Sequence, residues 1–246
     1  MEEQYIKDFE TFLKHTDEKE VLYQALVEEI KSNHFSSILD IGAGNGDLSL
    51  PLSKLVNRYL AVEQKPKYVQ RLKSLGIEVI EGSWPISVSG QEPFDLVLSS
   101  HSISYHHSKV WPFLTAAWEQ VAVGGELLII TFRGEPDDWT DLTAKMGDDL
   151  LSYHEPAFAD LIEGLNKWGE TQVSKIITTV QTSNFEQMLE SLAFVYSDGH
   201  LERREKFFSY ETIITNLLNQ KYHQGDKYTF PFQHFLIRVK KVDLSA

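Results

Sequence analysis

The stretch ILDIGAGNGDLSLPL, residues 38–52, decides how this sequence folds. An apolar run ends at Asp40, a glycine-rich loop follows, and a helical pattern begins at residue 47. The glycines of this loop are Gly42, Gly44 and Gly46. Because glycine has no Cβ, such a loop turns tightly and lets a ligand approach the backbone closely. The stretch therefore predicts a strand, a ligand-binding loop and a helix, in that order.

The spacing of the glycines narrows the class of ligand. A dinucleotide fingerprint, G-x-G-x-x-G, would place its third glycine at position 47, which is Asp47 here. A carboxylate at that position would face the phosphates of a dinucleotide. The G-x-G-x-G spacing behind an acid instead suits a ligand with a zwitterionic amino-acid end. The next apolar run, 58–63, ends at Glu63, whose carboxylate can accept hydrogen bonds from both hydroxyls of a ribose.

Short apolar strands alternate with helical patterns on both sides of this loop. We expect two helices within 5–31, broken near 14–20, strands at 36–42, 58–63, 77–82, 94–101 and 125–132, and helices at 47–57, 66–75 and 108–122. Strands separated by helices predict βαβ units and a parallel sheet. Right-handed crossovers then place helices on both faces of the sheet.

The pattern changes after residue 134. We expect helices over 136–170, 183–192 and 209–220, strands over 194–205 and 228–241, and an ambiguous segment at 173–182 whose β-branched residues favour extended structure. This organisation predicts one doubly wound α/β domain with a helical insertion over its carboxyl edge. It does not predict two independent domains.

Composition and charge exclude several function classes. The chain has 246 residues, 42% of them hydrophobic, and a formal net charge of −13 without a basic run, which is unfavourable for binding nucleic acid. It contains no cysteine, so neither a disulfide framework nor a thiolate metal site is expected. No apolar run reaches membrane-spanning length and the N-terminus lacks a signal pattern, so we expect a cytoplasmic protein without membrane contacts.

These motifs together resemble those of the class I S-adenosylmethionine-dependent methyltransferases. Asp40 and the glycine loop match the family's first motif, and Glu63 matches its ribose-binding acid. EGSWP (81–85) corresponds to the loop bordering adenine, with Ser83 where an aspartate often stands. FDLVLSSHSISYH (94–106) matches the fourth motif, and VAVGGELLII (121–130) matches a P-G-G-x-L-x-I turn with Val123 replacing proline. The resemblance covers residues 36–133.

The resemblance implies a fold, a cofactor and the residues that hold it. The fold is a Rossmann-like, doubly wound, mostly parallel seven-stranded sheet in one domain, residues 1–246. Its parts are an N-terminal helical lid (1–35), a cofactor-binding half (36–133) and acceptor-side helices with closing strands (134–246). The cofactor is S-adenosyl-L-methionine, with S-adenosyl-L-homocysteine as product. The implied cofactor-binding residues are Asp40, Gly42, Gly44, Gly46, Glu63, Gln64, Ser83, Trp84 and Ser100.

Outside the sheet the chain is similar to the histamine N-methyltransferases. Residues 5–22 resemble their N-terminal substrate lid, and 137–150 resemble a tryptophan-containing helix after the fifth strand. The implied acceptor-binding residues are Tyr5, Phe9, Glu18, His101, Tyr105 and Trp139, with Glu18 facing a cationic amine. His101 replaces a glutamine, and Thr143 and Leu150 replace aromatic pocket residues, so the acceptor is not fixed as histamine.

SSHSISYHH, residues 99–107, raises a separate question, because three histidines within nine residues could bind a metal. His106 and His107 are adjacent and point in different directions, and no carboxylate follows at ligand spacing, so no metal site is predicted. Ligands of open α/β sheets bind beyond the carboxyl ends of the strands. His101 and Tyr105 are therefore expected at the acceptor, and His101 is a candidate base. With Glu18 they form the predicted catalytic set.

Ordinary structural roles stay open for several of these residues. Glu18 can be an acid at a helix start behind the capping Thr16, Tyr5 and Phe9 can be core residues of an N-terminal helix, and Trp139 can be a packing residue.

The predicted reaction is methyl transfer to a small-molecule amine or imidazole nitrogen. An O-methyltransferase of a small metabolite, a protein or RNA methyltransferase, and a non-enzymatic binding module remain alternatives. The D/N-P-P-Y/F loop of base-modifying enzymes and the carboxylates of a magnesium-dependent site are both absent from the segment that follows residue 98. Oligomeric state cannot be read from the sequence.

Overall fold

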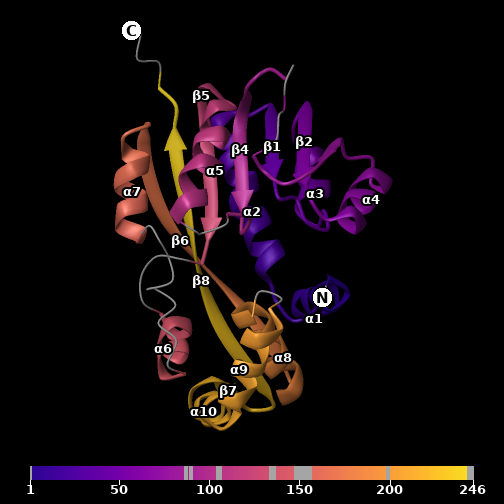
Figure 1. Ribbon diagram of the computed structural model, residues 1–246, viewed down its shortest axis with the longest axis vertical. Coiled ribbons are helices and arrows are strands. Elements are labelled where there is room, and N and C mark those ends of the chain that lie inside the picture. The colour runs from indigo at the N-terminus through magenta and orange to yellow at the C-terminus, as the bar shows by residue number, and fades with distance from the viewer. Residues whose placement is uncertain are drawn as a thin grey trace. The chain divides into compact units, whose positions relative to one another are not determined.

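The structure is a computed structural model that describes residues 2–85, 88, 91–103, 107–132, 137–146, 157–197 and 200–242 (Figure 1). Its helices are α1 (Glu2–Leu13), α2 (Glu18–Asn33), α3 (Ser49–Ser53), α4 (Pro66–Ser74), α5 (His107–Glu119), α6 (Asp138–Lys145), α7 (Phe158–Asn166), α8 (Phe185–Ser197), α9 (Leu201–Ser209), α10 (Glu211–Leu217) and the π-helix η1 (Leu218–Tyr222). Its strands are β1 (Ser37–Ile41), β2 (Arg58–Glu63), β3 (Val79–Glu81), β4 (Phe94–Ser100), β5 (Val121–Thr131), β6 (Glu170–Thr182), β7 (His223–Gln224) and β8 (Lys227–Lys240). None of the described helices has the length and apolarity needed to cross a membrane.

The strands form one sheet in the order β3-β2-β1-β4-β5-β8-β6, with the two-residue β7 paired to β8. The pairs β2–β3, β1–β2, β1–β4 and β4–β5 are parallel, and β8 runs antiparallel to β5. The order 3-2-1-4-5 is that of a Rossmann sheet, whose strand order reverses between β1 and β4. The predicted α/β class and its mostly parallel, seven-stranded path are confirmed; β7 is an additional short strand.

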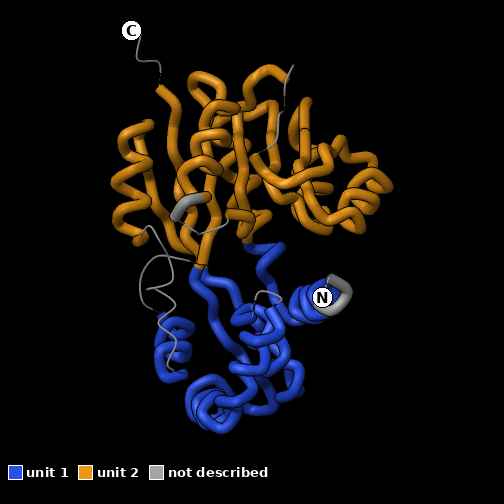
Figure 2. The backbone as a smooth tube through the Cα atoms, in the orientation of Figure 1, with its two compact units in different colours: residues 1–21, 136–151, 177–233 blue, residues 22–135, 152–176, 234–246 orange. Residues whose placement is uncertain are grey.

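The chain divides into two compact units (Figure 2). Unit 1 comprises residues 1–21, 136–151 and 177–233, and unit 2 comprises residues 22–135, 152–176 and 234–246. The elements α2, β6 and β8 each contribute residues to both units. The division differs from the three segments expected from the sequence, and the expectation of a single domain stays a prediction.

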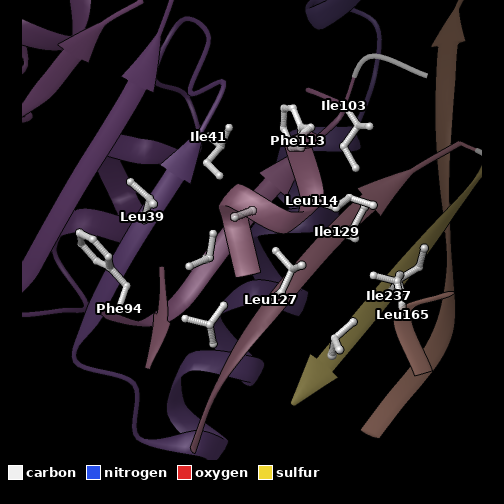
Figure 3. Close-up of a cluster of buried hydrophobic side chains, with 14 of the residues drawn as sticks. Leu39, Ile41, Phe94, Ile103, Phe113, Leu114, Leu127, Ile129, Leu165 and Ile237 are labelled. Atoms are coloured by element: carbon white, nitrogen blue, oxygen red, sulfur yellow. The ribbon is translucent and has the colours of Figure 1, made fainter. Parts of the chain in front are cut away.

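Unit 2 contains the parallel strands and two apolar cores, one on each face of the sheet. Strands covered on both faces are apolar at successive positions, and all five residues of β1 are buried. Figure 3 shows one core, built from alternate residues of β1 and β5 with α5: Leu39, Ile41, Leu127, Ile129, Phe113 and Leu114. The intervening residues form the other core with α2, α3 and α4: Ile38, Leu128, Ile130, Leu22, Leu26, Leu52 and Leu72. This alternation makes the fold doubly wound, and ligands of such folds bind beyond the carboxyl ends of the strands.

Unit 1 contains α1, α6, α8, α9, α10 and η1, and its interior is rich in aromatic residues. Six of its buried rings are connected by ring contacts with centroid separations of 4.6 to 6.4 Å: Trp139, Tyr196, Phe207, Tyr222, Phe230 and Phe232. Arg204 of α9 forms ion pairs with Asp8 of α1 and Glu190 of α8, which ties the three helices together.

The expected strand at 194–205 is wrong. Helix α8 continues to Ser197 and α9 begins at Leu201. The β-branched and aromatic run suggested a strand, but a short apolar run is compatible with a buried helix as well. Leu192, Phe194 and Tyr196 are all buried in unit 1, so burial decided the helix. The ambiguous 173–182 lies within the long strand β6. Helices α6 and α7 lie within the expected helical range 136–170, whose last residue, Glu170, begins β6.

Candidate functional site

The glycine loop follows β1, and its three glycines have φ of +79°, +59° and +85°. A Cβ on Gly42 would lie 2.3 Å from Ser102 Cβ, and one on Gly46 would lie 2.9 Å from Leu72 Cδ2. These two glycines are therefore required for packing against the protein itself. A Cβ on Gly44 would meet no described atom within 4 Å. The backbone at Gly44 is thus the open side of the loop, where a ligand can approach.

Glu63, at the end of β2, connects that open side to the neighbouring strand. Its side chain is buried, with Oε2 accepting from the Gly44 N–H at 2.8 Å and Oε1 accepting from the Lys65 N–H at 2.8 Å. A carboxylate has about four lone-pair sites, so these two bonds leave acceptor capacity on both oxygens. The acid predicted from the next strand is therefore brought beside the loop, and it can accept further hydroxyl groups there.

Asp40 lies beneath the loop in a buried network that the sequence did not predict. Its Oδ2 accepts from Ser49 Oγ at 2.7 Å and from the Tyr59 hydroxyl at 2.6 Å. Burial, and then the negative charge of Asp40, raise the pKa of Tyr59 well above its usual value of 10. Tyr59 therefore stays protonated and continues to donate. Asp40 thus joins β1, β2 and α3, which is a structural role whether or not it also contacts a ligand.

The residues proposed for the adenine side lie after β2 and β3. Ser83 Oγ donates to Gln64 Oε1 at 2.6 Å, and both side chains are exposed. These strands are parallel neighbours, with Glu63 opposite Glu81 in the register, so the two segments that follow them are adjacent. Trp84 is half-buried and its indole Nε1–H donates to the Phe113 carbonyl at 3.0 Å.

At the end of β4, His101 has φ of +53°, a left-handed conformation that is uncommon for residues other than glycine. Its backbone N–H donates to the Ile130 carbonyl at 3.0 Å, and its ring stacks on Phe132 with centroids 4.3 Å apart. Its Nε2 lies 3.1 Å from Nδ1 of the fully buried His234. Thr131 pairs with Phe235 across β5 and β8, so this register brings Phe132 and His234 together beside β4.

The loop after β4 is also tied to the glycine loop. Ser102 Oγ donates to the Ile41 carbonyl at 2.5 Å and is 2.8 Å from Ser99 Oγ. Ser100 Oγ is buried and has no hydrogen-bond partner among the residues that the structure describes. The carboxyl ends of β1, β2 and β4 therefore present polar groups at one edge of the sheet, at the reversal of strand order.

Unit 1 holds four of the residues predicted for the acceptor: Tyr5, Phe9, Glu18 and Trp139. Tyr5 and Phe9 stack with centroids 6.2 Å apart, and each lies 5.6 Å from the ring of Phe194. Glu18, the first residue of α2, is 3% exposed, and its Oε1 accepts from Lys19 Nζ at 2.8 Å. The Lys19 ammonium also lies 6.0 Å from the centroid of the Phe9 ring. A carboxylate and an aromatic face thus already contact one cation of the chain.

Comparisons with known proteins give structural neighbours only. No family model and no curated protein matches this sequence. The YcgJ protein from Bacillus subtilis has a TM-score of 0.61, 16% identity, and coverage of 89% of this chain and 99% of that chain. The N-methyltransferase NodS from Bradyrhizobium japonicum, in complex with S-adenosyl-L-homocysteine, has a TM-score of 0.52, 12% identity, and coverage of 90% and 86%. A SAM-dependent methyltransferase from Thermotoga maritima, described as a possible histamine N-methyltransferase, has a TM-score of 0.52, 14% identity, and coverage of 97% and 97%.

This chain has the methyltransferase fold. The class I resemblance stated from the glycine loop is confirmed at the level of the fold. Within the methyltransferase fold, unit 2 holds the cofactor residues proposed from the sequence. The structure places them at or just beyond the carboxyl ends of β1, β2, β3 and β4. It leaves their contacts with a cofactor as predictions.

The residues proposed for the acceptor divide between those that the structure places and those that it does not describe. Trp139 is 6% exposed and packs against Phe230 and Phe232 with centroids 6.1 and 5.3 Å away. The packing alternative therefore describes its environment, and an acceptor contact by Trp139 stays a prediction. Tyr105 and Leu150 lie outside the described residues.

Two residues of the candidate site, Tyr59 and His234, were not predicted from the sequence. Tyr59 lies in an apolar strand, where a tyrosine is an ordinary packing residue. His234 is one imidazole within the aromatic closing strand, where only the register with β5 shows that it meets His101. A histidine within the closing strand was the available signal, but it carried no information about its partner.

Proposed function

We propose that this protein is an S-adenosyl-L-methionine-dependent methyltransferase that methylates a small-molecule acceptor at an amine or imidazole nitrogen. The observation that carries the proposal is the open backbone of Gly44, hydrogen-bonded to Glu63, within a methyltransferase fold. S-adenosyl-L-homocysteine would be the second product.

The described residues fit the cofactor. Gly44 leaves room for a ligand at the loop, and Glu63 retains acceptor capacity for the ribose hydroxyls. Gln64 and Ser83 supply exposed polar groups for the adenine side. Ser100 offers a buried hydroxyl without a partner among the described residues, which a bound polar group would satisfy.

When bound, the cofactor supplies an electrophilic methyl group: the acceptor nitrogen forms the new N–C bond while the C–S electron pair returns to sulfur. The protein's contribution is to position the reactants, and such positioning can supply roughly 7–11 kcal/mol of the barrier reduction. A protonated amine must first lose a proton. His101, at the end of β4, is the proposed base, because an imidazole titrates near neutral pH and strand ends of this fold face the ligand.

A cationic amine or imidazolium is the acceptor class that Glu18, Tyr5 and Phe9 favour. A buried carboxylate forms charge-assisted hydrogen bonds with such a cation, and aromatic faces attract it. The Lys19 ammonium already has both kinds of contact, with Glu18 and with the ring of Phe9. A protonated amine acceptor would take the place of the Lys19 ammonium as the cation that contacts Glu18 and the ring of Phe9.

The cofactor assignment is tested by calorimetric titration of S-adenosyl-L-homocysteine into wild type and Glu63→Ala. Removing the carboxylate loses the proposed ribose contact and also frees the Gly44 amide, so affinity should fall at least about tenfold, which is roughly 1.4 kcal/mol. Glu78→Ala, which removes an exposed acid just before β3, at the end of that strand away from the loop, is the matched control and should bind as wild type does. Unchanged affinity in Glu63→Ala would remove the cofactor assignment.

The acceptor class is tested by Glu18→Gln together with a turnover screen over amines, imidazoles including histamine, phenols and carboxylates. Glu18→Gln should raise the KM for a cationic acceptor roughly tenfold or more, with cofactor affinity unchanged, because it loses a charge-assisted hydrogen bond. Equal loss of both affinities, or of neither, would exclude Glu18 from the acceptor site. Turnover restricted to hydroxyl or carboxylate acceptors would replace the proposal with O-methylation.

A further inference from the structure

We propose that His234 is a positioning residue for methyl transfer: it accepts a hydrogen bond from His101 and holds His101 in the tautomer that can act as a base. This inference rests on the proposed function, in which His101 removes the acceptor's proton. The two imidazoles lie 133 residues apart in the sequence and belong to the same compact unit, unit 2.

The geometry of the pair is that of a hydrogen bond between imidazoles. His234 Nδ1 and His101 Nε2 are 3.1 Å apart, the ring centroids are 5.1 Å apart, and the rings are inclined at 64°. That N···N distance lies within the range for a nitrogen donor. Such a contact needs one N–H and one lone pair, so each ring constrains the tautomer of the other.

The proposed role of His101 as a base sets the direction of the hydrogen bond. If His101 donates from Nε2 to His234, its Nδ1 carries the lone pair that takes a proton from the acceptor amine. After that transfer His101 is an imidazolium, and its bond to His234 becomes a charge-assisted one, which is stronger. If His234 donated instead, His101 would hold its proton at Nδ1 and could gain another only by breaking the bond to His234. A base at this position therefore requires His234 as the acceptor.

The surroundings hold both rings in place. His234 is fully buried, so its ring cannot turn into solvent. Phe132 lies against both imidazoles, with centroids 4.3 Å from His101 and 4.5 Å from His234. An aromatic face next to His101 also favours the imidazolium that forms during the reaction.

The backbone of His101 is a further independent observation. Its φ of +53° is unfavourable for a residue with a Cβ, and such conformations persist where neighbouring contacts determine them. Here the hydrogen bond to Ile130, the stack on Phe132 and the bond to His234 supply those contacts. Conformations of this kind cluster at functional sites, where they aim a side chain.

The test begins with the tautomer, which can be measured without an acceptor. Protein labelled with 15N-histidine is studied by long-range 1H–15N NMR, and the signals of His101 are assigned by their loss in His101→Gln. In the wild type, Nε2 of His101 should carry the proton and Nδ1 should not. In His234→Phe, which keeps ring volume but removes the acceptor, the signals should shift toward a mixture of both tautomers. In His234→Asn, whose side-chain oxygen can replace Nδ1, the wild-type tautomer should return.

The same variants are then compared in turnover with histamine as the probe. His234→Phe should lower kcat at least about tenfold, within the roughly 10²–10⁴-fold that a general base contributes. His234→Asn should recover most of that loss. Cofactor affinity by calorimetry should be unchanged in both, because neither substitution touches the glycine loop. If His234→Phe does not fold, His234→Asn paired with His234→Leu gives the same comparison.

Specific outcomes would overturn the inference. A wild-type proton on Nδ1 of His101, or a tautomer unaffected by His234→Phe, would remove His234 as the acceptor. Stoichiometric zinc chloride shifting both ring signals in the wild type, with the effect lost in either single variant, would make the pair metal ligands instead of a hydrogen-bonded dyad. Failure of the wild type to bind S-adenosyl-L-homocysteine would instead refute the proposed function, while the NMR result would still decide the hydrogen bond.

Discussion

Gly44→Ala separates the ligand-binding role of the glycine loop from its backbone strain. Gly44 has φ of +59°, close to the left-handed minimum, and a Cβ there would meet no described atom within 4 Å. An alanine in that conformation costs roughly 1–2 kcal/mol of folding free energy but clashes with nothing in the described part of the protein. For a chain of this size, each 1 kcal/mol lowers Tm by about 2–4 °C. The variant should therefore fold and show only a modest loss of thermal stability.

The effect on ligand binding should be larger than that on folding. The added methyl group occupies the side of Gly44 on which the ligand would approach, so affinity for S-adenosyl-L-homocysteine should fall at least about tenfold. Gly225→Ala is the matched control, because Gly225 has φ of +65° and a Cβ there also meets no described atom within 4 Å. It should lose a similar amount of Tm and no affinity.

The pair is measured by differential scanning calorimetry and by isothermal titration. Equal affinity in Gly44→Ala and Gly225→Ala, with both variants folded, would refute the reasoning that the open side of Gly44 is a ligand-binding surface. A much larger loss of Tm in Gly44→Ala than in Gly225→Ala would show that Gly44 is needed for packing, as Gly42 is.

Two carboxylates make the stability of the chain depend on pH in opposite directions. Burial, and then the negative charge of Glu29, raise the pKa of Glu126, so its contribution is present at low pH and is lost as pH rises through the raised value. The free energy of unfolding of Glu126→Gln, measured by urea denaturation, should therefore exceed that of the wild type, and by more at pH 8 than at pH 5. A variant less stable than wild type at pH 8 would contradict this. Partial burial raises the pKa of Asp95, but hydrogen bonds from Ser36 and Ser37 outweigh it and lower that pKa, so its contribution is present above the unfolded value and is lost as pH falls. Asp95→Asn should cost about 1 kcal/mol at pH 7 and less at pH 3; an equal cost at both values would show that the charge of Asp95 is not involved.

The parts of the site that sequence analysis could reach are those encoded by neighbouring residues. The loop from Gly42 to Gly46 follows an apolar strand and precedes a helix, and Glu63 ends the next strand. Parallel strands joined by a helix align their carboxyl ends, which is the physical reason that an acid at the end of the next strand lies near the loop. The hydrogen bond from the Gly44 amide to Glu63 places this acid beside the loop, and its contact with a ribose stays a prediction.

Where one sequence pattern is compatible with both a strand and a helix, the prediction from the sequence was wrong. Residues 194–205 carry an aromatic and β-branched run that predicts a strand, and they form parts of α8 and α9. Phe194 is buried against Phe12 and Tyr196 against Trp139, and both contacts are long-range. Local propensity is worth tenths of a kcal/mol per residue, whereas burying an aromatic side chain is worth about 1.5–3 kcal/mol, so tertiary burial decides.

The sequence by itself determined the alternation of strands and helices, the glycine loop and the acid that accompanies it, because each depends on short-range periodicity and on residues without a Cβ. Only the tertiary structure decided that Tyr59 and Ser49 hold Asp40, and that His234 meets His101. Sheet pairing and register bring these partners together, to within 3.1 Å for the two histidines. The sequence around each residue does not predict such a partner. The physical reason is that a hydrogen bond requires only the right atoms at the right distance, and the fold as a whole sets that distance.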